Sequence, residues 1–343
     1  MEKMRAMVLS ECAQIETEPL TLLNIDRHEI SRSSEILIKI EACGVCHSQL
    51  HGIEGDWKDI GIPPALPTVP GHEVVGTVVQ IGDAVTKFQV GDRAGITPLL
   101  EACRDCQYCK DGKEYLCESS VITGESFKGG YSEYITVTED FATRVPQTMK
   151  PEYAAPLFCA GITAYKAVKA AEPQAHKRMG IFGIGGVGHM AVQFAKAEGC
   201  DVIAFSRSSN HLDVAKRLGA VGTMTFSEDD GFLQQIKEGY GLLDAAIVFA
   251  PADTVTETAI KSVKKGGLVV IATVGKNPPF LAFEEKTIRG TLIGSTRDME
   301  QVIKICDEKK FEVISETFPL EDANQVLKKL KYSEIEARAV LIP

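Results

Sequence analysis

The sequence predicts an α/β protein in which a doubly wound parallel sheet accompanies a β-rich domain. The chain has 343 residues, more than one compact core usually holds, so two domains are expected. Up to about residue 155, short β-branched runs are separated by Gly and Pro. Beyond that point, Ala-rich helical segments alternate with short apolar segments, which is typical of a parallel sheet.

The N-terminal part is expected to be a compact β-rich domain. Glu35–Ile40 and Glu73–Val79 are runs of mostly apolar, β-branched residues, and both predict strands. Gly91–Arg93 predicts a turn between two such runs.

The middle of the chain shows the alternation of strand and helix. Met179–Phe182 predicts a strand, which a Gly-rich turn joins to a helix over Val187–Glu198. The pattern continues with a strand at Asp201–Phe205, a helix at Asn210–Leu218 and buried strands at Ala245–Phe249 and Leu268–Val274.

The last part of the chain predicts a helix from about Asp298, a strand at Glu312–Phe318, a further helix and a strand at Ala337–Ile342. We expect this tail to return to the first domain, with the middle part of the chain inserted as the second domain. The expected division is residues 1–155 and 293–343 for one domain and 156–292 for the other.

Composition narrows the class of protein. The net charge of −10 argues against duplex nucleic acid as a partner, since such binding depends on Lys and Arg that neutralise phosphates. No apolar run reaches the ~18 residues of a membrane span, and no apolar signal segment follows Met1. We therefore expect a cytoplasmic protein without a membrane partner, whose ten cysteines serve metal binding more than disulfides.

A glycine-rich loop predicts a dinucleotide site. The G-x-G-x-x-G pattern follows a predicted strand and opens a predicted helix, the context that gives this motif its meaning. The glycines allow a tight turn, close approach of the pyrophosphate and packing of helix on strand, and the helix N-terminus attracts phosphate. The expected contacts in the loop are Gly183, Gly185, Gly186, Val187 and Gly188.

The end of the second strand indicates which dinucleotide binds. An NAD site usually has a carboxylate here for the ribose 2′-hydroxyl, but this chain has Ser206, Arg207 and Ser208. A guanidinium and two hydroxyls suit a 2′-phosphate. The sequence predicts a preference for NADP(H), with NAD(H) as the alternative.

Seven further residues fall at the spacings of two zinc sites. Four cysteines saturate a tetrahedral zinc and predict a closed, structural site, whereas three protein ligands leave a position open for substrate. The closed set is Cys103, Cys106, Cys109 and Cys117, and the open set is Cys46, His72 and Cys159.

These motifs together resemble the medium-chain, zinc-dependent alcohol dehydrogenases. Cys43–His51 is similar to the segment carrying their first zinc ligand, Gly71–Glu73 to the second, and Cys159–Thr163 to the third. The Ser206–Ser209 stretch is closest to the NADP-dependent, cinnamyl-alcohol-dehydrogenase-like branch. The resemblance implies a GroES-like catalytic domain, an inserted Rossmann domain and two zinc ions per chain, one catalytic and one structural.

The resemblance also assigns roles to single residues. Ser48 and His51 match a proton relay beside the catalytic ligands, His47 a contact to the cofactor pyrophosphate, and Thr163 a contact to the nicotinamide. Glu73 either lies behind the metal, ligates it, or forms a structural ion pair. The family commonly has Asp where this chain has Gln49, and we expect the amide oxygen of Gln49 to accept a hydrogen bond from the ligand histidine.

The sequence therefore predicts a zinc-dependent oxidoreductase that transfers a hydride between NADP(H) and an alcohol/aldehyde pair. Zinc would polarise the substrate oxygen while the cofactor exchanges the hydride. The partners implied are a small-molecule alcohol or aldehyde and further copies of the chain, in a homodimer or homotetramer. The alternatives are an NAD-dependent alcohol or polyol dehydrogenase and, from another class, a non-enzymatic zinc and nucleotide-binding redox sensor.

Overall fold

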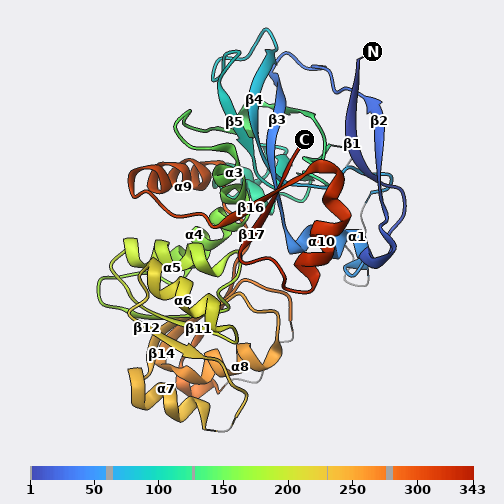
Figure 1. Cartoon of the computed structure of the whole chain (residues 1–343). Helices are drawn as coiled ribbons and strands as arrows, with labels where there is room; N and C mark the ends of the chain where they lie inside the picture. The colour runs from blue at the N-terminus through green and yellow to red at the C-terminus, as the bar shows by residue number, and fades with distance from the viewer. Residues whose placement is uncertain (1, 59–64, 126–127, 230, 276–280) are drawn as a thin grey trace. The chain divides into compact units, whose positions relative to one another are not determined.

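The computed structural model describes residues 2–58, 65–125, 128–229, 231–275 and 281–343. The chain forms two compact units, each considered by itself (Figure 1). The first consists of Met1–Cys159, Gly294–Glu308 and Val313–Pro343, and the second of Ala160–Ile293 and Lys309–Glu312.

The first unit is built around a seven-stranded sheet. Its longest strand, near the centre, pairs antiparallel with strands from the N-terminal part and with the last strand of the chain. The tail thus returns to the sheet of the first unit. The path of the sheet runs through β16 (Ser315–Pro319), β17 (Arg338–Ile342), β3 (Glu35–Val45), β4 (Glu73–Ile81), β5 (Arg93–Ile96) and β9 (Ala142–Arg144), and β8 (Tyr134–Thr138) pairs with β3.

Within the described residues, two small sheets and five helices complete the first unit. β1 (Lys3–Leu9) pairs with β2 (Leu20–Asp26), and β6 (Leu99–Glu101) pairs with β7 (Val121–Ile122). The helices are α1 (His47–Glu54), α2 (Gln107–Lys110), α3 (Pro151–Ala154), α9 (Thr296–Glu308) and α10 (Ala323–Lys331). Single 3-10 turns lie at Ile15–Thr17, Glu114–Leu116, Glu139–Phe141, Ala155–Phe158 and Leu320–Asp322.

The second unit contains a six-stranded sheet in which every pair of neighbours is parallel. In spatial order its strands are β12 (Gly222–Thr225), β11 (Asp201–Ser206), β10 (Arg178–Phe182), β13 (Leu243–Val248), β14 (Val263–Ile271) and β15 (Thr287–Gly290). β10, first along the chain, has β11 on one side and β13 on the other. The order therefore reverses at β10, and this is the position at which open α/β sheets bind ligands.

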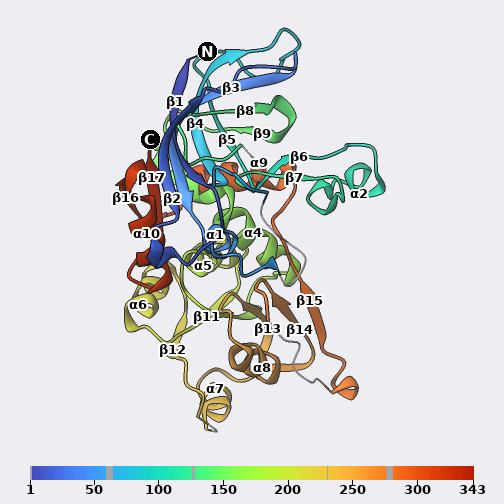
Figure 2. The ribbon, with the colours of Figure 1, turned by 90° about the vertical axis from the view of Figure 1, so that its right-hand side faces the viewer.

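Helices lie before β10 and in each connection from β10 to β14, because parallel strands need crossover connections. They are α4 (Ala160–Ala170), α5 (Gly188–Ala197), α6 (Ser209–Leu218), α7 (Phe232–Tyr240) and α8 (Asp253–Ser262), and a 3-10 turn covers Ala282–Glu284. β13, β14 and β15 run side by side in Figure 2.

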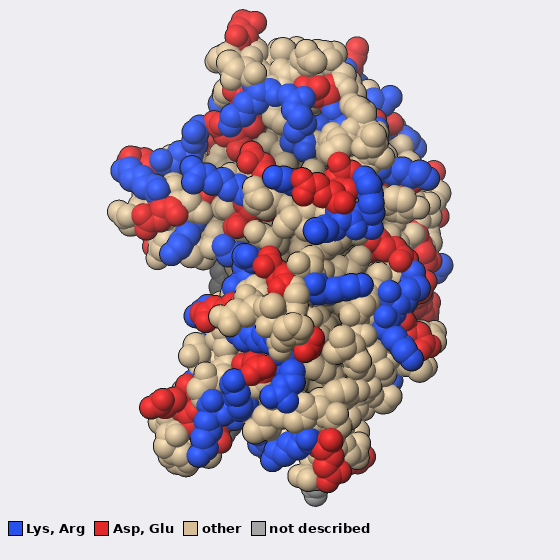
Figure 3. Space-filling view, turned by 90° about the vertical axis from the view of Figure 1, so that its left-hand side faces the viewer, with Lys and Arg blue, Asp and Glu red and all other residues tan. Residues whose placement is uncertain are grey.

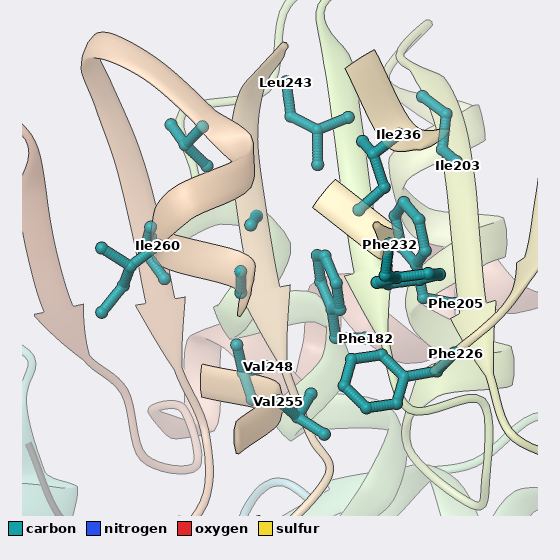
Figure 4. Packing of buried hydrophobic residues seen from close by; sticks show 14 residues of the cluster. Phe182, Ile203, Phe205, Phe226, Phe232, Ile236, Leu243, Val248, Val255 and Ile260 are labelled. Carbon is teal, nitrogen blue, oxygen red and sulfur yellow. The ribbon is translucent and has the colours of Figure 1, made fainter. Parts of the chain in front are cut away.

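An aromatic cluster forms much of the core of the second unit. The rings of Phe182 and Phe205 stack with centroids 4.3 Å apart and planes at 11°. Phe232 meets both Phe205 and Phe226 edge to face. Figure 4 shows these four rings gathered in one group, with Ile203 and Ile236 nearby. Strands β10 and β11 are thus fixed to the helix that follows β12, next to the glycine loop.

The predicted α/β class and the parallel sheet are confirmed. The predicted strands and helices are present, with boundaries that differ by a few residues. The largest differences are at β3, which continues to Val45, and β14, which begins at Val263. No described helix is long and apolar enough to span a lipid bilayer. On the face shown in Figure 3, basic and acidic side chains are interspersed.

Candidate active site and metal centres

The first cluster brings together ligands from three segments of the first unit. Cys46 follows β3, His72 and Glu73 lie at the start of β4, and Cys159 follows the 3-10 turn Ala155–Phe158. Potential ligand atoms of these four residues all lie within 4.8 Å of one another, and the sulfurs of Cys46 and Cys159 are 3.9 Å apart. The structure therefore assembles the predicted open set.

The pairing of β3 with β4 explains how the first two segments meet. Gly44 stands opposite Glu73 in the antiparallel register, so Cys46 and His72 emerge at the same end of the two strands. A Cβ on Gly44 would lie 1.8 Å from Oε2 of Glu73, which leaves room only for glycine. The close approach of the two strands thus depends on the absence of a side chain at Gly44.

Electrostatics at this cluster favour a cation. Contact with Cys159 lowers the pKa of Cys46, and the same contact, together with burial, raises the pKa of Cys159, so the two sulfurs compete for one proton. Burial lowers the pKa of His72, but contact with the sulfur of Cys46 and its charge outweigh burial, and the net pKa rises. Two thiol groups and an imidazole are ligands that zinc prefers, so these residues fit a zinc ion.

Glu73 is fully buried and faces a buried arginine. Both of its carboxylate oxygens accept hydrogen bonds from Nη2 of Arg338, a residue of β17. Burial raises the pKa of Glu73, and the guanidinium of Arg338 opposes that rise. The carboxylate is thus held by an ion pair directly beside the sulfur and imidazole ligands.

Ser48 lies in the first turn of α1 and points at the ligand cluster. Its Oγ donates to the sulfur of Cys46 at 3.2 Å and lies 3.4 Å from Nε2 of His72. The hydroxyl therefore lies directly against the ligand cluster.

His51 lies one helical turn after His47, whose side chain is exposed. Nδ1 of His51 is 2.8 Å from Oδ2 of Asp56, and the ring stacks on Trp57 with centroids 5.5 Å apart at 29°. Since the Asp56 carboxylate only accepts, Nδ1–H donates to it and Nε2 of the neutral ring is left to accept a proton.

The expected hydrogen bond of Gln49 is wrong. The oxygen of its amide accepts from the backbone N–H of Gly71 at 2.7 Å. It is the amide nitrogen that lies 2.7 Å from Nδ1 of His72. The backbone N–H of Gly71 takes the amide oxygen that His72 was expected to use. Gly71 has a left-handed backbone (φ +99°), and the direction of its N–H could not be predicted from the sequence.

The second cluster lies in the loop after β6, with α2 at its far end (Figure 2). The sulfurs of Cys103, Cys106, Cys109 and Cys117 lie within 4.8 Å of one another. Hydrogen bonds from backbone N–H groups, chiefly that of Asp105, lower the pKa of Cys103 to about 6. Burial is the main cause that raises the pKa of Cys109 to about 12. Backbone N–H groups that point at sulfur and four converging thiol groups suit a closed zinc site.

The glycine loop has the shape that a dinucleotide needs. Gly183 has φ +97° and follows β10 directly, and a Cβ on Gly188 would lie 1.9 Å from the carbonyl oxygen of Gly183. Around Gly185, by contrast, a Cβ would meet no atom within 4 Å. Gly186 and Val187 are half-buried and lead into α5, whose N-terminus offers backbone N–H groups to a phosphate.

The residues after Phe205 present hydroxyls and a cation. Ser206 ends β11, and its buried Oγ accepts from the backbone N–H of Ser208 at 3.3 Å. The side chain of Ser208 caps α6 by accepting from His211. Arg207 is exposed, and its guanidinium has no hydrogen-bond or ion-pair partner among the described residues. Thr163, the predicted nicotinamide contact, lies half-buried in α4.

Sequence reasoning did not identify two residues of the first cluster's surroundings. Asp56 orients His51, and its only signal is its place in a short Gly-Asp-Trp segment after α1. Arg338 pairs with Glu73 across 265 positions of sequence, and nothing near Arg338 indicates that contact.

Two family models match successive regions of the chain. The model of the alcohol dehydrogenase GroES-like domain matches residues 32–147. The model named zinc-binding dehydrogenase matches residues 186–308. The first region includes Cys46, His72 and the four-cysteine loop, and the second begins inside the glycine loop.

Relatives match over nearly the whole chain. An alcohol dehydrogenase of Geobacillus stearothermophilus is 39% identical over 331 residues, which are 94% of this chain and 96% of the relative. A cinnamyl alcohol dehydrogenase structure from Sorghum bicolor has a TM-score of 0.87 at 30% identity, covering 99% of this chain and 98% of that one. Acetophenone reductase from Geotrichum candidum, solved in complex with NAD, has a TM-score of 0.87 at 28% identity, with 100% and 98% covered. The chain belongs to the medium-chain, zinc-dependent alcohol dehydrogenase family and is a zinc-dependent alcohol dehydrogenase.

Proposed function

We propose that this alcohol dehydrogenase prefers NADP(H) and interconverts small alcohols with their aldehydes. The observation that carries the proposal is the guanidinium of Arg207 between Ser206 and Ser208, which has no partner among residues of described structure. No carboxylate stands at this end of β11. A 2′-phosphate would gain charge-assisted hydrogen bonds there, whereas a ribose hydroxyl would find no acceptor carboxylate. Gly183, Gly185, Gly186, Val187 and Gly188 would hold the pyrophosphate.

The first unit is proposed to carry the chemistry. Cys46, His72 and Cys159 would hold a catalytic zinc, with Glu73 beside it as the partner of Arg338. Zinc, when bound, supplies a Lewis acid that polarises the substrate oxygen, and the nicotinamide supplies or takes the hydride. Cys103, Cys106, Cys109 and Cys117 would hold a second, structural zinc.

The chain's own residues would move the proton. Ser48 Oγ is proposed to accept it from the substrate hydroxyl, because this group already lies against the sulfur of Cys46 and the ring of His72. His51 would be the end of the relay, since Asp56 fixes its Nδ1–H and leaves Nε2 as acceptor. His47 and Thr163 are proposed to contact the cofactor. We also propose that the chain works as a homodimer or homotetramer.

One experiment tests the proposed reaction. Initial rates are measured with NADPH and with NADH on a panel of aliphatic and aromatic aldehydes and polyol-derived ketones, before and after metal chelation. We expect aldehyde reduction that is faster with NADPH, that is lost on chelation and that returns with zinc. Faster turnover with NADH would favour the alternative of an NAD-dependent alcohol dehydrogenase, and a preference for ketoses would favour a polyol dehydrogenase.

A further inference from the structure

We propose that Gln49 is a positioning residue whose side-chain amide weakens zinc binding at Cys46, His72 and Cys159. The amide nitrogen donates to Nδ1 of His72, whereas a histidine that binds zinc through Nε2 needs Nδ1 to carry the proton and donate. The inference rests on the proposed catalytic zinc. It concerns how firmly the site keeps that ion.

The amide of Gln49 has a fixed orientation. Its oxygen faces the backbone N–H of Gly71 and its nitrogen faces Nδ1 of His72, both at 2.7 Å. A backbone N–H only donates, so an amide turned the other way would set two donors against each other. Both Gln49 and His72 are 3% exposed, and a donor left unpaired at this depth is costly.

This orientation determines where the proton of His72 lies. An NH₂ group only donates, so Nδ1 must accept, and the N–H of the neutral ring is then on Nε2. Nε2 is also the nitrogen nearest the ligand cluster, since Ser48 Oγ lies 3.4 Å from it and donates to Cys46. A histidine ligand needs the reverse: a lone pair toward the metal and an N–H that donates away from it.

The surrounding backbone keeps the amide in place. A Cβ on Gly124 would lie 3.0 Å from Oε1 of Gln49 and 2.7 Å from the backbone nitrogen of Gly71. The backbone of Gly124 therefore packs closely against the hydrogen bond between Gly71 and Gln49. Turning the amide toward a zinc-competent His72 would give up the hydrogen bond from Gly71. A carboxylate of the same length has two acceptor oxygens and could serve Gly71 N–H and His72 Nδ1–H together.

The test is the zinc affinity of the intact chain with Gln49, Gln49→Glu and Gln49→Asp, measured by competition with a chromogenic zinc chelator. We expect Gln49→Glu to bind the zinc at Cys46, His72 and Cys159 roughly 10- to 100-fold more tightly than the parent chain. Changes of this size are typical when the hydrogen-bond partner of a metal ligand is replaced. The four-cysteine zinc is an internal reference that should not change. If the Glu side chain of Gln49→Glu disturbs folding, the shorter acid of Gln49→Asp provides the same comparison of zinc affinity.

A matched control separates hydrogen bonding from charge. Glu125 lies near enough to His72 to act on it electrostatically, so Glu125→Gln changes the local charge by one while leaving the Nδ1 contact alone. We expect its zinc affinity to change by less than about threefold. A loss in Glu125→Gln as large as the gain in Gln49→Glu would show that charge explains both, and the proposal would fail.

A second readout reports the tautomer directly. Ring ¹⁵N shifts of His72 after zinc removal should show an unprotonated Nδ1 in the parent chain and a protonated Nδ1 in Gln49→Glu. A protonated Nδ1 in the parent chain, or equal zinc affinities in the two proteins, would overturn the inference. A parent chain that binds one zinc, lost in Cys106→Ser and unaffected by Cys159→Ser, would instead overturn the catalytic zinc of the proposed function.

Discussion

Among single residues, Arg207 has the most direct bearing on cofactor choice. It is exposed at the end of β11, and its guanidinium has no hydrogen-bond or ion-pair partner in the part of the chain that the structure describes. We expect Arg207→Asp to lower the ratio of kcat/KM for NADPH to that for NADH by about 10- to 100-fold, since it removes a charged hydrogen-bond donor and adds a charge that repels phosphate. Initial-rate kinetics with both cofactors and one aldehyde measure this ratio.

The control for Arg207 is Lys237→Asp, which makes the same change of charge at an exposed position of α7. Its ratio should stay within about twofold of the parent value. An unchanged ratio in Arg207→Asp, with turnover intact, would mean that other groups select the dinucleotide.

Single residues also show what sequence can and cannot predict at the site. The two cysteine-containing ligand sets could be predicted because metal ligands obey spacing and chemistry. The partners behind them could not, because each depends on a distance in space: Arg338 reaches Glu73 from the far end of the chain, and Gly71 N–H takes the oxygen of Gln49.

Among the elements, the four-cysteine loop is the one that we expect to depend most on a metal. Its helix α2 has four residues, none buried, and Tyr108 and Leu116 are 44% and 40% exposed. Such a segment has no apolar core of its own, so we expect the proposed structural zinc to supply the free energy that shapes it. One tie to the rest of the first unit is Glu114, which accepts hydrogen bonds from the backbone and hydroxyl of Thr296, at the start of α9.

We therefore expect Cys106→Ser to lose one zinc per chain and to lower Tm by about 5 °C or more, while kcat/KM at low temperature stays within a fewfold of the parent. Differential scanning calorimetry, zinc content and kinetics on the same preparation check this. Cys12→Ser is the control, because Cys12 belongs to neither cluster and should leave all three unchanged. A large loss of kcat with an unchanged Tm would contradict a structural role.

At the same scale, strongly patterned elements could be predicted and weakly patterned ones could not. β10, β11 and α6 have apolar runs or a clear cap, such as Ser208. The short strands β12 and β15 have four residues each and lack a buried run, so only their pairing with neighbours defines them. α8 begins without a side-chain cap, so the sequence lacks the N-cap residue that usually marks the start of a helix.

At the scale of the whole molecule, the unfolding of each unit can be followed by a separate signal. The only tryptophan, Trp57, lies in the first unit, and the phenylalanine cluster lies in the second. We expect Phe205→Ala to destabilise the second unit by roughly 3–5 kcal/mol, since it removes a fully buried ring stacked on Phe182. In urea, the loss of helical circular dichroism should then begin at lower concentration than the change in Trp57 fluorescence.

Val221→Ala is the control for Phe205→Ala, because Val221 is 67% exposed in the same unit and should leave both transitions in place. If the two signals shift together in Phe205→Ala by the same amount, the units unfold as one and the prediction is wrong.

The position of β17 has a consequence for synthesis. β3 emerges early, but the strand that lies beside it, and the guanidinium that neutralises Glu73, are translated only after the entire second unit. A growing chain must therefore carry an unpaired strand edge and a buried acid without its counter-ion while the nucleotide-binding half is already able to fold. The unit that holds the proposed catalytic ligands matures last, and this interval is when the nascent polypeptide is most exposed to aggregation and most dependent on chaperones.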